Sequence, residues 1–149
     1  MDKAMGDYFL STDKAKLNLD VIHNFLYTCY WCKGIPVDSL ERSVERSLCF
    51  GVYRAEPLSQ VGFARVVTDY ATFMHVADVF SVDEHRGQGL GIALIDYSVN
   101  HPDLHGIRTW TLLNAEAHGL YEKVSFEDSR SGRFMQRKIP YPYVLEEQS

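Results

Sequence analysis

Residues 82–91 read Val-Asp-Glu-His-Arg-Gly-Gln-Gly-Leu-Gly, with three glycines within five residues between a strand-like and a helix-like segment. Glycine has no Cβ, so the backbone of such a turn can approach a ligand that a bulky side chain would block. The N–H groups and dipole at the start of the next helix favour an anion, and Arg86 adds a cationic donor. The segment Arg86-Gly87-Gln88-Gly89-Leu90-Gly91 therefore predicts a phosphate-binding loop. A simple tight turn is the alternative that glycines alone leave open.

Two common phosphate motifs do not fit this loop. A nucleotide triphosphatase loop needs Lys followed by Ser or Thr after its last glycine, and this chain has Ile92-Ala93. In the dinucleotide-binding fingerprint the third small residue would fall at Leu94. The antiparallel strands expected before the loop also disfavour a Rossmann domain.

The hydrophobic pattern on both sides of the loop predicts one domain over residues 1–149. Helices are expected from Asn18 or Asp20 to near Trp31 and from Asp38 or Ser39 onward. Three antiparallel strands (48–53, 60–68, 72–82) precede the loop, and an apolar helix (92–99) follows it. A strand at 6–12, a strand at 107–113, a helix at 115–124 and late strands at 126 and 134–139 complete the order. This predicts an α/β fold with a mixed, mostly antiparallel sheet of about six to seven strands and about four helices.

Composition narrows the class of protein. The apolar fraction of 46% and the charged fraction of 23% are those of a globular domain. There is no membrane-spanning or signal-like run, which predicts a cytoplasmic protein without a membrane partner. A net charge of −5 argues against a nucleic-acid partner. Reduced cysteines are expected, and the six histidines lack the paired spacing of a zinc site, so no metal is predicted.

Two motifs together resemble a known family. Val82-x-x-x-Arg86-Gly87-x-Gly89-x-Gly91 resembles the coenzyme A signature of the GNAT N-acetyltransferase superfamily, Arg/Gln-x-x-Gly-x-Gly/Ala. Downstream, Asn114-x-x-Ala117-x-x-Leu120-Tyr121-x-Lys123-x-x-Phe126 is similar to that family's Asn-x-x-Ala-x-x-Leu-Tyr-x-Lys-x-Gly-Phe. The resemblance covers residues 61–128 and departs at Ser125, where the family usually has glycine.

The resemblance implies acetyl-CoA as cosubstrate and assigns roles to the matching residues. Tyr121 matches the general acid that protonates the departing thiolate; a space-filling tyrosine is the alternative. The family pairs the pantetheine arm with the backbone of the strand before the loop, here Phe80, Ser81 and Val82. Ala117 would join the glycine loop in binding the coenzyme. Asn114 would contact the pantetheine arm or order the active-site strand, and Lys123 would reach the coenzyme phosphates or cover the helix as a solvated side chain.

A base for the acceptor amine is expected on the strand at 72–82. Strict alternation would place Asp78 on one face with Met74, Val76, Phe80 and Val82, where desolvation would make its carboxylate a stronger base. The position also matches acid–base residues of some family members. An aspartate bound to a backbone turn, to His75 or to Arg65 is an equally weighted alternative, and a bulge would change its facing.

The sequence indicates less about the acetyl acceptor than about the acetyl donor. In the family, the loop between the first two helices borders the acceptor site, which would place Tyr30, Trp31 and Ile35 there; ordinary core positions are the alternative. We therefore expect direct acetyl transfer in a ternary complex to a primary amine, preferably of a small molecule. A protein acceptor and a non-catalytic acyl-CoA sensor remain alternatives. A free strand edge and the aromatic residues at 141–143 would allow a homodimer.

Overall fold

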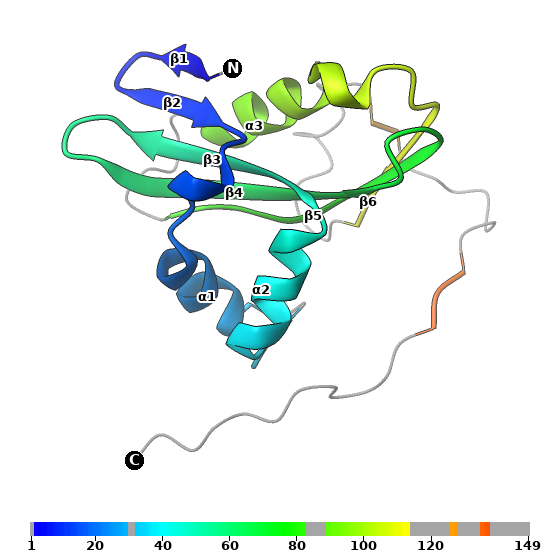
Figure 1. The fold of residues 1–149 in the computed structure, drawn as a ribbon, viewed down its shortest axis with the longest axis horizontal. Helices are drawn as coiled ribbons and strands as arrows, with labels where there is room; N and C mark the ends of the chain where they lie inside the picture. Colours follow the sequence, from blue (N-terminus) through cyan, green and yellow to red (C-terminus); the bar gives the residue numbers. More distant parts are fainter. Residues whose placement is uncertain (1, 30–31, 83–88, 114–125, 128–134, 138–149) are drawn as a thin grey trace.

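In the described part of the chain, six strands form one sheet whose spatial order follows the sequence (Figure 1). The structure is a computed structural model and describes residues 2–29, 32–82, 89–113, 126–127 and 135–137. The strands are β1 (Lys3–Met5), β2 (Tyr8–Ser11), β3 (Leu48–Arg54), β4 (Ser59–Thr68), β5 (Phe73–Ser81) and β6 (Thr109–Leu112). β1 to β5 pair antiparallel, whereas β6 joins β5 in parallel. The predicted mixed, mostly antiparallel α/β sheet is confirmed.

Three α-helices lie on the two faces of this sheet: α1 (Leu19–Tyr27), α2 (Val37–Glu45) and α3 (Leu90–Val99). Figure 1 shows α3 on one face and α1 and α2 on the other. Asn18 caps α1, as predicted, because its side-chain oxygen accepts from the amides of Asp20 and Val21. The prediction that Asp38 or Ser39 opens the second helix is wrong: Pro36, with an extended backbone, occupies the cap of α2 without a side-chain hydrogen bond.

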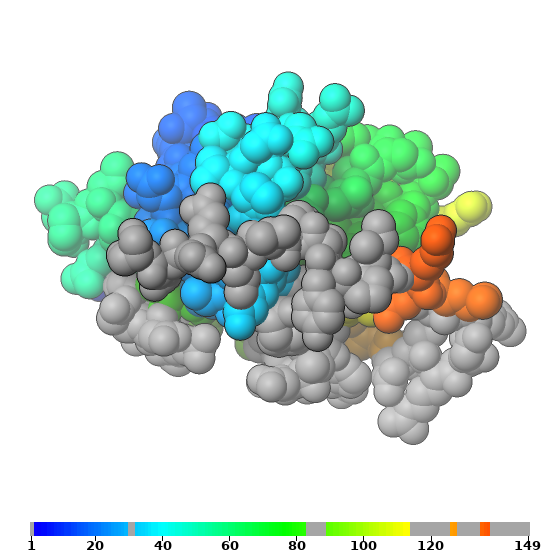
Figure 2. All heavy atoms as spheres, turned by 90° about the horizontal axis from the view of Figure 1, so that it is seen from below, coloured from blue at the N-terminus to red at the C-terminus, as the bar shows by residue number. Residues whose placement is uncertain are grey.

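Each face of the sheet has its own apolar core. In one core, Leu94 of α3 lies among side chains from alternate positions of the central strands, including Phe50, Val52, Val66 and Met74. In the other, Ile22 and Leu26 of α1 and Leu40 of α2 lie with Phe63 and Phe80 of the sheet. Figure 2 looks onto this second face, where α2, in cyan, stands over the sheet. The sheet is thus covered on both faces, which the hydrophobic strands predicted.

A β-bulge in β5 divides the residues of this strand between the two cores. Phe63 pairs with Phe80 but Arg65 pairs with Ala77, so Ala64 faces two residues, Asp78 and Val79. Asp78 has a left-handed backbone with φ 56°. Because of this extra residue, the β5 side chains after the bulge point to the opposite face of the sheet from the one that strict alternation predicts.

The predicted alternation along β5 is therefore wrong. Met74 and Val76 belong to the core beneath α3, whereas Phe80 belongs to the core beneath α1 and α2. A period of two assumes one residue per ladder position, and the bulge breaks that assumption between these residues. The bulge named as an alternative from the sequence is what the structure has.

The C-terminal predictions fall largely outside the described residues. This applies to the helix at 115–124, to most of the late strands and to the aromatic residues at 141–143. The described residues 126–127 and 135–137 lie in neither helix nor strand. None of the helices described is long and apolar enough to cross a membrane.

Candidate functional site

The start of α3 has a backbone geometry that can bind an anion. Gly89, the residue before the helix, has a left-handed backbone with φ 74°, and a Cβ added there would have no heavy atom within 4 Å. Within the described part of the chain, no side chain caps the first turn. The N–H groups of the first helical turn have no acceptor within the helix itself, so they are the groups through which this turn could bind an anion.

This geometry fits the phosphate-binding role predicted for the loop. Gly89 and Gly91 keep side chains away from the helix start, while the Leu90 side chain is buried in the core. The Leu90 side chain thus anchors the turn, which leaves its backbone as the part that could contact a ligand. Arg86, Gly87 and Gln88 lie outside the described residues.

The described pairing between β5 and β6 ends just before the bulge. Their parallel ladder runs from Phe73 paired with Thr109 to Val76 paired with Leu112, and β5 continues to Ser81. In the described residues, the β5 edge beyond Val76 is therefore not paired with β6. An extended ligand chain could hydrogen-bond to such an edge as an added strand.

The predicted backbone positions at this edge are not equivalent. The Val82 amide donates to the Val61 carbonyl at 2.8 Å, so it points toward β4. Because successive residues of a strand direct their polar groups to opposite sides, Phe80 also faces β4 and Ser81 faces away from it. Of Phe80, Ser81 and Val82, Ser81 is the residue placed to bond an added strand.

Asp78 faces α1 and α2 and forms a short ion pair. Arg65 Nε donates to Asp78 Oδ2 at 2.9 Å, and Arg65 Nη1 donates to Ser47 Oγ at 3.1 Å. The Asp78 side chain is 10% exposed and the Arg65 side chain 18%. Of the alternatives weighed for Asp78, the pair with Arg65 is formed.

Sequence reasoning treated Arg65 as a competitor for Asp78 and missed Ser47. A signal for Arg65 was present, because it is a lone cation in the apolar run from Val61 to Val67. A cation buried in a central strand needs a buried partner. The sequence offered no comparable signal for Ser47, which is brought to Arg65 by the start of β3.

Two cysteines at the end of α1 lie close enough to Asp78 for its charge to act on them. Burial, followed by the Asp78 charge, raises the pKa of Cys32 to about 12 and also raises the pKa of Cys29. Cys29 Sγ donates to the Phe25 carbonyl and Cys32 Sγ to the Leu26 carbonyl. Both side chains are therefore neutral, hydrogen-bonded thiols at neutral pH, as expected from the sequence.

An aromatic pair lies next to these groups. The rings of Phe25 and Phe80 stack with centroids 4.1 Å apart and planes 10° apart. Ile35 is buried in the same core, which is the ordinary core position weighed as its alternative. Tyr30 and Trp31, the other predicted acceptor residues, lie outside the described residues.

The predicted residues of the second motif also fall outside the described part. Asn114, Ala117, Tyr121 and Lys123 belong to this group. Their roles remain predictions from the sequence.

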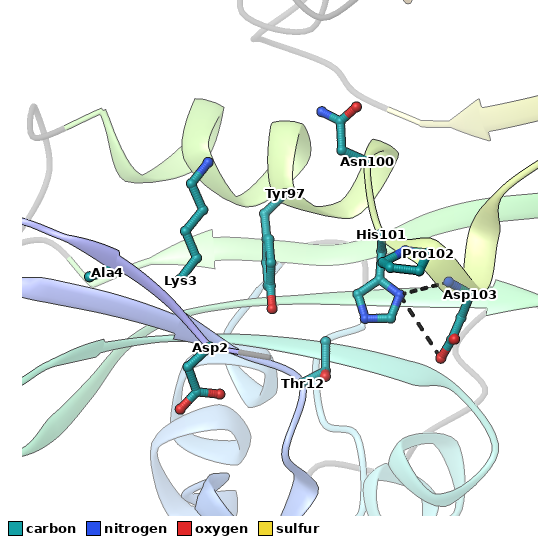
Figure 3. Close-up of a pocket in the computed structure, with 9 residues that line it drawn as sticks. All are labelled: Asp2, Lys3, Ala4, Thr12, Tyr97, Asn100, His101, Pro102 and Asp103. Carbon is teal, nitrogen blue, oxygen red and sulfur yellow. Dashed lines mark hydrogen bonds and ion pairs between the residues drawn. The ribbon is translucent and has the colours of Figure 1, made fainter.

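A pocket of about 720 Å³ lies on the opposite face, between the C-terminal end of α3 and the first hairpin. Figure 3 shows Tyr97 and His101 projecting into it from the α3 side, with Asp2 and Thr12 opposite. His101 Nδ1 accepts from the Asp103 amide at 3.1 Å. None of the described residues predicted for the active site lines this pocket.

Comparison with known proteins agrees with the predicted fold and family. The family model of the acetyltransferase (GNAT) domain matches residues 46–128 of this chain. A Gibberella zeae protein named as an acetyltransferase is 36% identical over 104 residues, which cover 58% of this chain. The chain spans 59% of the length of that relative.

Solved structures extend the comparison over nearly the whole chain. A GNAT-family protein from Xanthomonas campestris pv. campestris is 40% identical with a TM-score of 0.87, covering 94% of this chain and 99% of that one. An acetyltransferase from Clostridium acetobutylicum, solved with acetyl-CoA, shares the fold at 13% identity, with a TM-score of 0.62 and coverage of 88% and 94%. The chain belongs to the GNAT acetyltransferase family, whose members use acetyl-CoA.

Proposed function

We propose that this chain binds acetyl-CoA and moves its acetyl group to the primary amine of a small molecule, by direct transfer in a ternary complex. The observation that carries the proposal is the end of β5, where a bulge carries the Asp78 carboxylate and the strand then continues to Ser81 beyond its described pairing with β6. Along the chain, this segment is followed by the glycine loop and by α3, whose first residue Leu90 comes after the left-handed Gly89.

Each described feature has a chemical task in this reaction. The first-turn amides of α3 would hold the pyrophosphate, and the Ser81 backbone would align the pantetheine arm. Acetyl-CoA supplies an activated acetyl group as its thioester. Asp78 would accept the proton that the amine loses as its nitrogen bonds to the acetyl carbon, directly or through a water. Tyr121, assigned from its motif, would give a proton to the departing sulfur.

The surroundings of Asp78 support a small acceptor with an apolar portion. The stacked Phe25 and Phe80 rings and the neutral Cys29 and Cys32 thiols offer an apolar wall beside a carboxylate. A neutral amine would approach Asp78 with its nitrogen while its hydrocarbon part packs against that wall.

A panel of amines, followed by the free thiol released from acetyl-CoA, tests the proposal. The panel should contain arylalkyl amines, aliphatic amines, polyamines and lysine-containing peptides. We expect turnover with small apolar amines that falls at least about 100-fold in Asp78→Asn, since general base catalysis contributes roughly that much. Turnover with peptides alone would indicate a protein acceptor, and acetyl-CoA binding without turnover of any amine would indicate a sensor.

A further inference from the structure

Arg65 connects three neighbouring strands through one side chain. It lies on β4, donates from Nε to Asp78 on β5, and donates from Nη1 to Ser47 at the start of β3. Ser47 is itself 5% exposed. The two bonds leave from different nitrogens of a planar guanidinium, so they fix both its position and its tilt.

Asp78, the residue that Arg65 holds through its Nε, has an unusual backbone conformation. Asp78 is one of two residues other than glycine with positive φ among those described, at 56°. For such residues the left-handed conformation costs of order 1–2 kcal/mol and persists where surrounding contacts hold it. The Arg65 bond at 2.9 Å is such a contact, and it acts on the carboxylate itself.

Four further described residues feel the Asp78 charge and are neutral at neutral pH. Burial and the Arg65 charge lower the pKa of His75, and burial raises the pKa of Cys49 to about 11. Cys29 and Cys32 are neutral thiols for the reason given above. Arg65, in contrast, brings a positive charge within 2.9 Å of the carboxylate.

We propose that Arg65 is a positioning residue for acetyl transfer, acting through Asp78. It holds one carboxylate oxygen of Asp78 at the bulge and thereby fixes the direction in which the carboxylate faces the acceptor amine. Ser47 holds the far end of the guanidinium. This inference rests on the proposed function, because it requires Asp78 to take part in the reaction.

The test compares Arg65→Met with a matched Arg54→Met control in the full chain, using the best amine of the panel. Arg54 is an exposed residue at the end of β3, and its Nε donates to the Glu56 carbonyl at 3.3 Å. We expect kcat of Arg65→Met to fall roughly 10- to 100-fold, as for other losses of orientation. The KM for acetyl-CoA should change less than about twofold, since the coenzyme contacts lie elsewhere. Arg54→Met should match the wild type.

Two further variants separate positioning from a general structural role. Arg65→Lys should recover part of kcat, because an ammonium can reach Asp78 or Ser47 but cannot hold both in the same geometry. The double variant Arg65→Met with Asp78→Asn should be no slower than Asp78→Asn alone, because residues that act as a unit are not additive. Circular dichroism and the thermal midpoint check that each variant is folded.

The possible failures are distinguishable. If Asp78→Asn is slow but Arg65→Met keeps the wild-type kcat, or if the two losses add in the double variant, this inference is overturned and the proposed function stands. If Asp78→Asn is as fast as the wild type, the role of Asp78 fails and the inference fails with it. If no amine is acetylated, the proposed function itself fails.

Discussion

At the scale of single residues, the candidate site depends on backbone conformations that few residues adopt. Gly89 at the start of α3 and Asp78 in the bulge both have positive φ. Gly89 lets the chain enter the first turn of α3, and Asp78 carries a carboxylate that faces α1 and α2. Each can be tested by a substitution that is compared with a control substitution elsewhere in the chain.

Gly89→Ala should weaken acetyl-CoA binding. A residue with a Cβ costs about 1–2 kcal/mol in the left-handed conformation, so the turn would relax away from its ligand-binding form. We expect roughly a tenfold rise in Kd, equivalent to about 1.4 kcal/mol, measured by calorimetry. Gly106→Ala is the control, because Gly106 also has positive φ and no heavy atom within 4 Å of an added Cβ. An equal loss of binding in both variants would contradict the assignment.

Tyr53→Phe should stabilise the protein. The Tyr53 hydroxyl is buried without a hydrogen-bond partner among the described residues, while its ring stacks on Phe9. Phenylalanine keeps the ring and removes a buried polar atom that costs about 1–3 kcal/mol when unsatisfied. Urea unfolding should show a gain of about 1 kcal/mol. Tyr70→Phe, at a tyrosine that is 49% exposed, should leave stability unchanged.

At the scale of elements, short side-chain networks determine where strands turn. Between β4 and β5, Asp69 Oδ1 accepts from the amides of Ala71, Thr72 and Phe73, and Oδ2 accepts from the Thr72 hydroxyl at 2.6 Å. These bonds, those of Thr72 first, hold the pKa of the Asp69 carboxyl well below its usual range.

Asp69→Ala should therefore lower the thermal midpoint in a pH-dependent way. A carboxyl whose pKa is depressed by folding contributes stability above its unfolded pKa, near 3.8, and loses that contribution as the pH falls toward the folded value. The difference in midpoint between wild type and variant should be largest near pH 6 and should shrink below about pH 4. A difference that stays constant down to about pH 2.5 would contradict this.

The elements also show how far sequence reasoning reaches. The strands before the glycine loop, the α1 cap at Asn18 and the apolar α3 follow from local pattern and were predicted. The bulge at Asp78 was named as an alternative but could not be placed, because an extra residue in one strand depends on its pairing with β4. The Arg65–Asp78 pair depends on the same register, so the sequence could offer it only as one option among several.

At the scale of the whole molecule, one sheet separates two cores with different neighbours. Leu94 of α3 packs in the core on one face of the sheet, and Leu26 of α1 packs in the core on the other face; both are fully buried. The α3 core supports the start of the helix that would bind the coenzyme. The other core supports the wall beside Asp78.

Leu94→Ala and Leu26→Ala should each cost about 2–5 kcal/mol of unfolding free energy, as cavities in packed cores do. Because the two sites lie on opposite faces, their costs should add within about 0.5 kcal/mol in the double variant. Urea unfolding measures this directly. Strong coupling between the two losses would show that the faces are not independent cores.

The measurement that bears most directly on the account is calorimetric titration of the folded protein with acetyl-CoA. We predict saturable binding with one site per chain, weakened in Gly89→Ala and retained in Gly106→Ala. If acetyl-CoA gives no binding heat at millimolar concentration with protein shown to be folded, α3 does not hold the coenzyme and the proposed function is wrong.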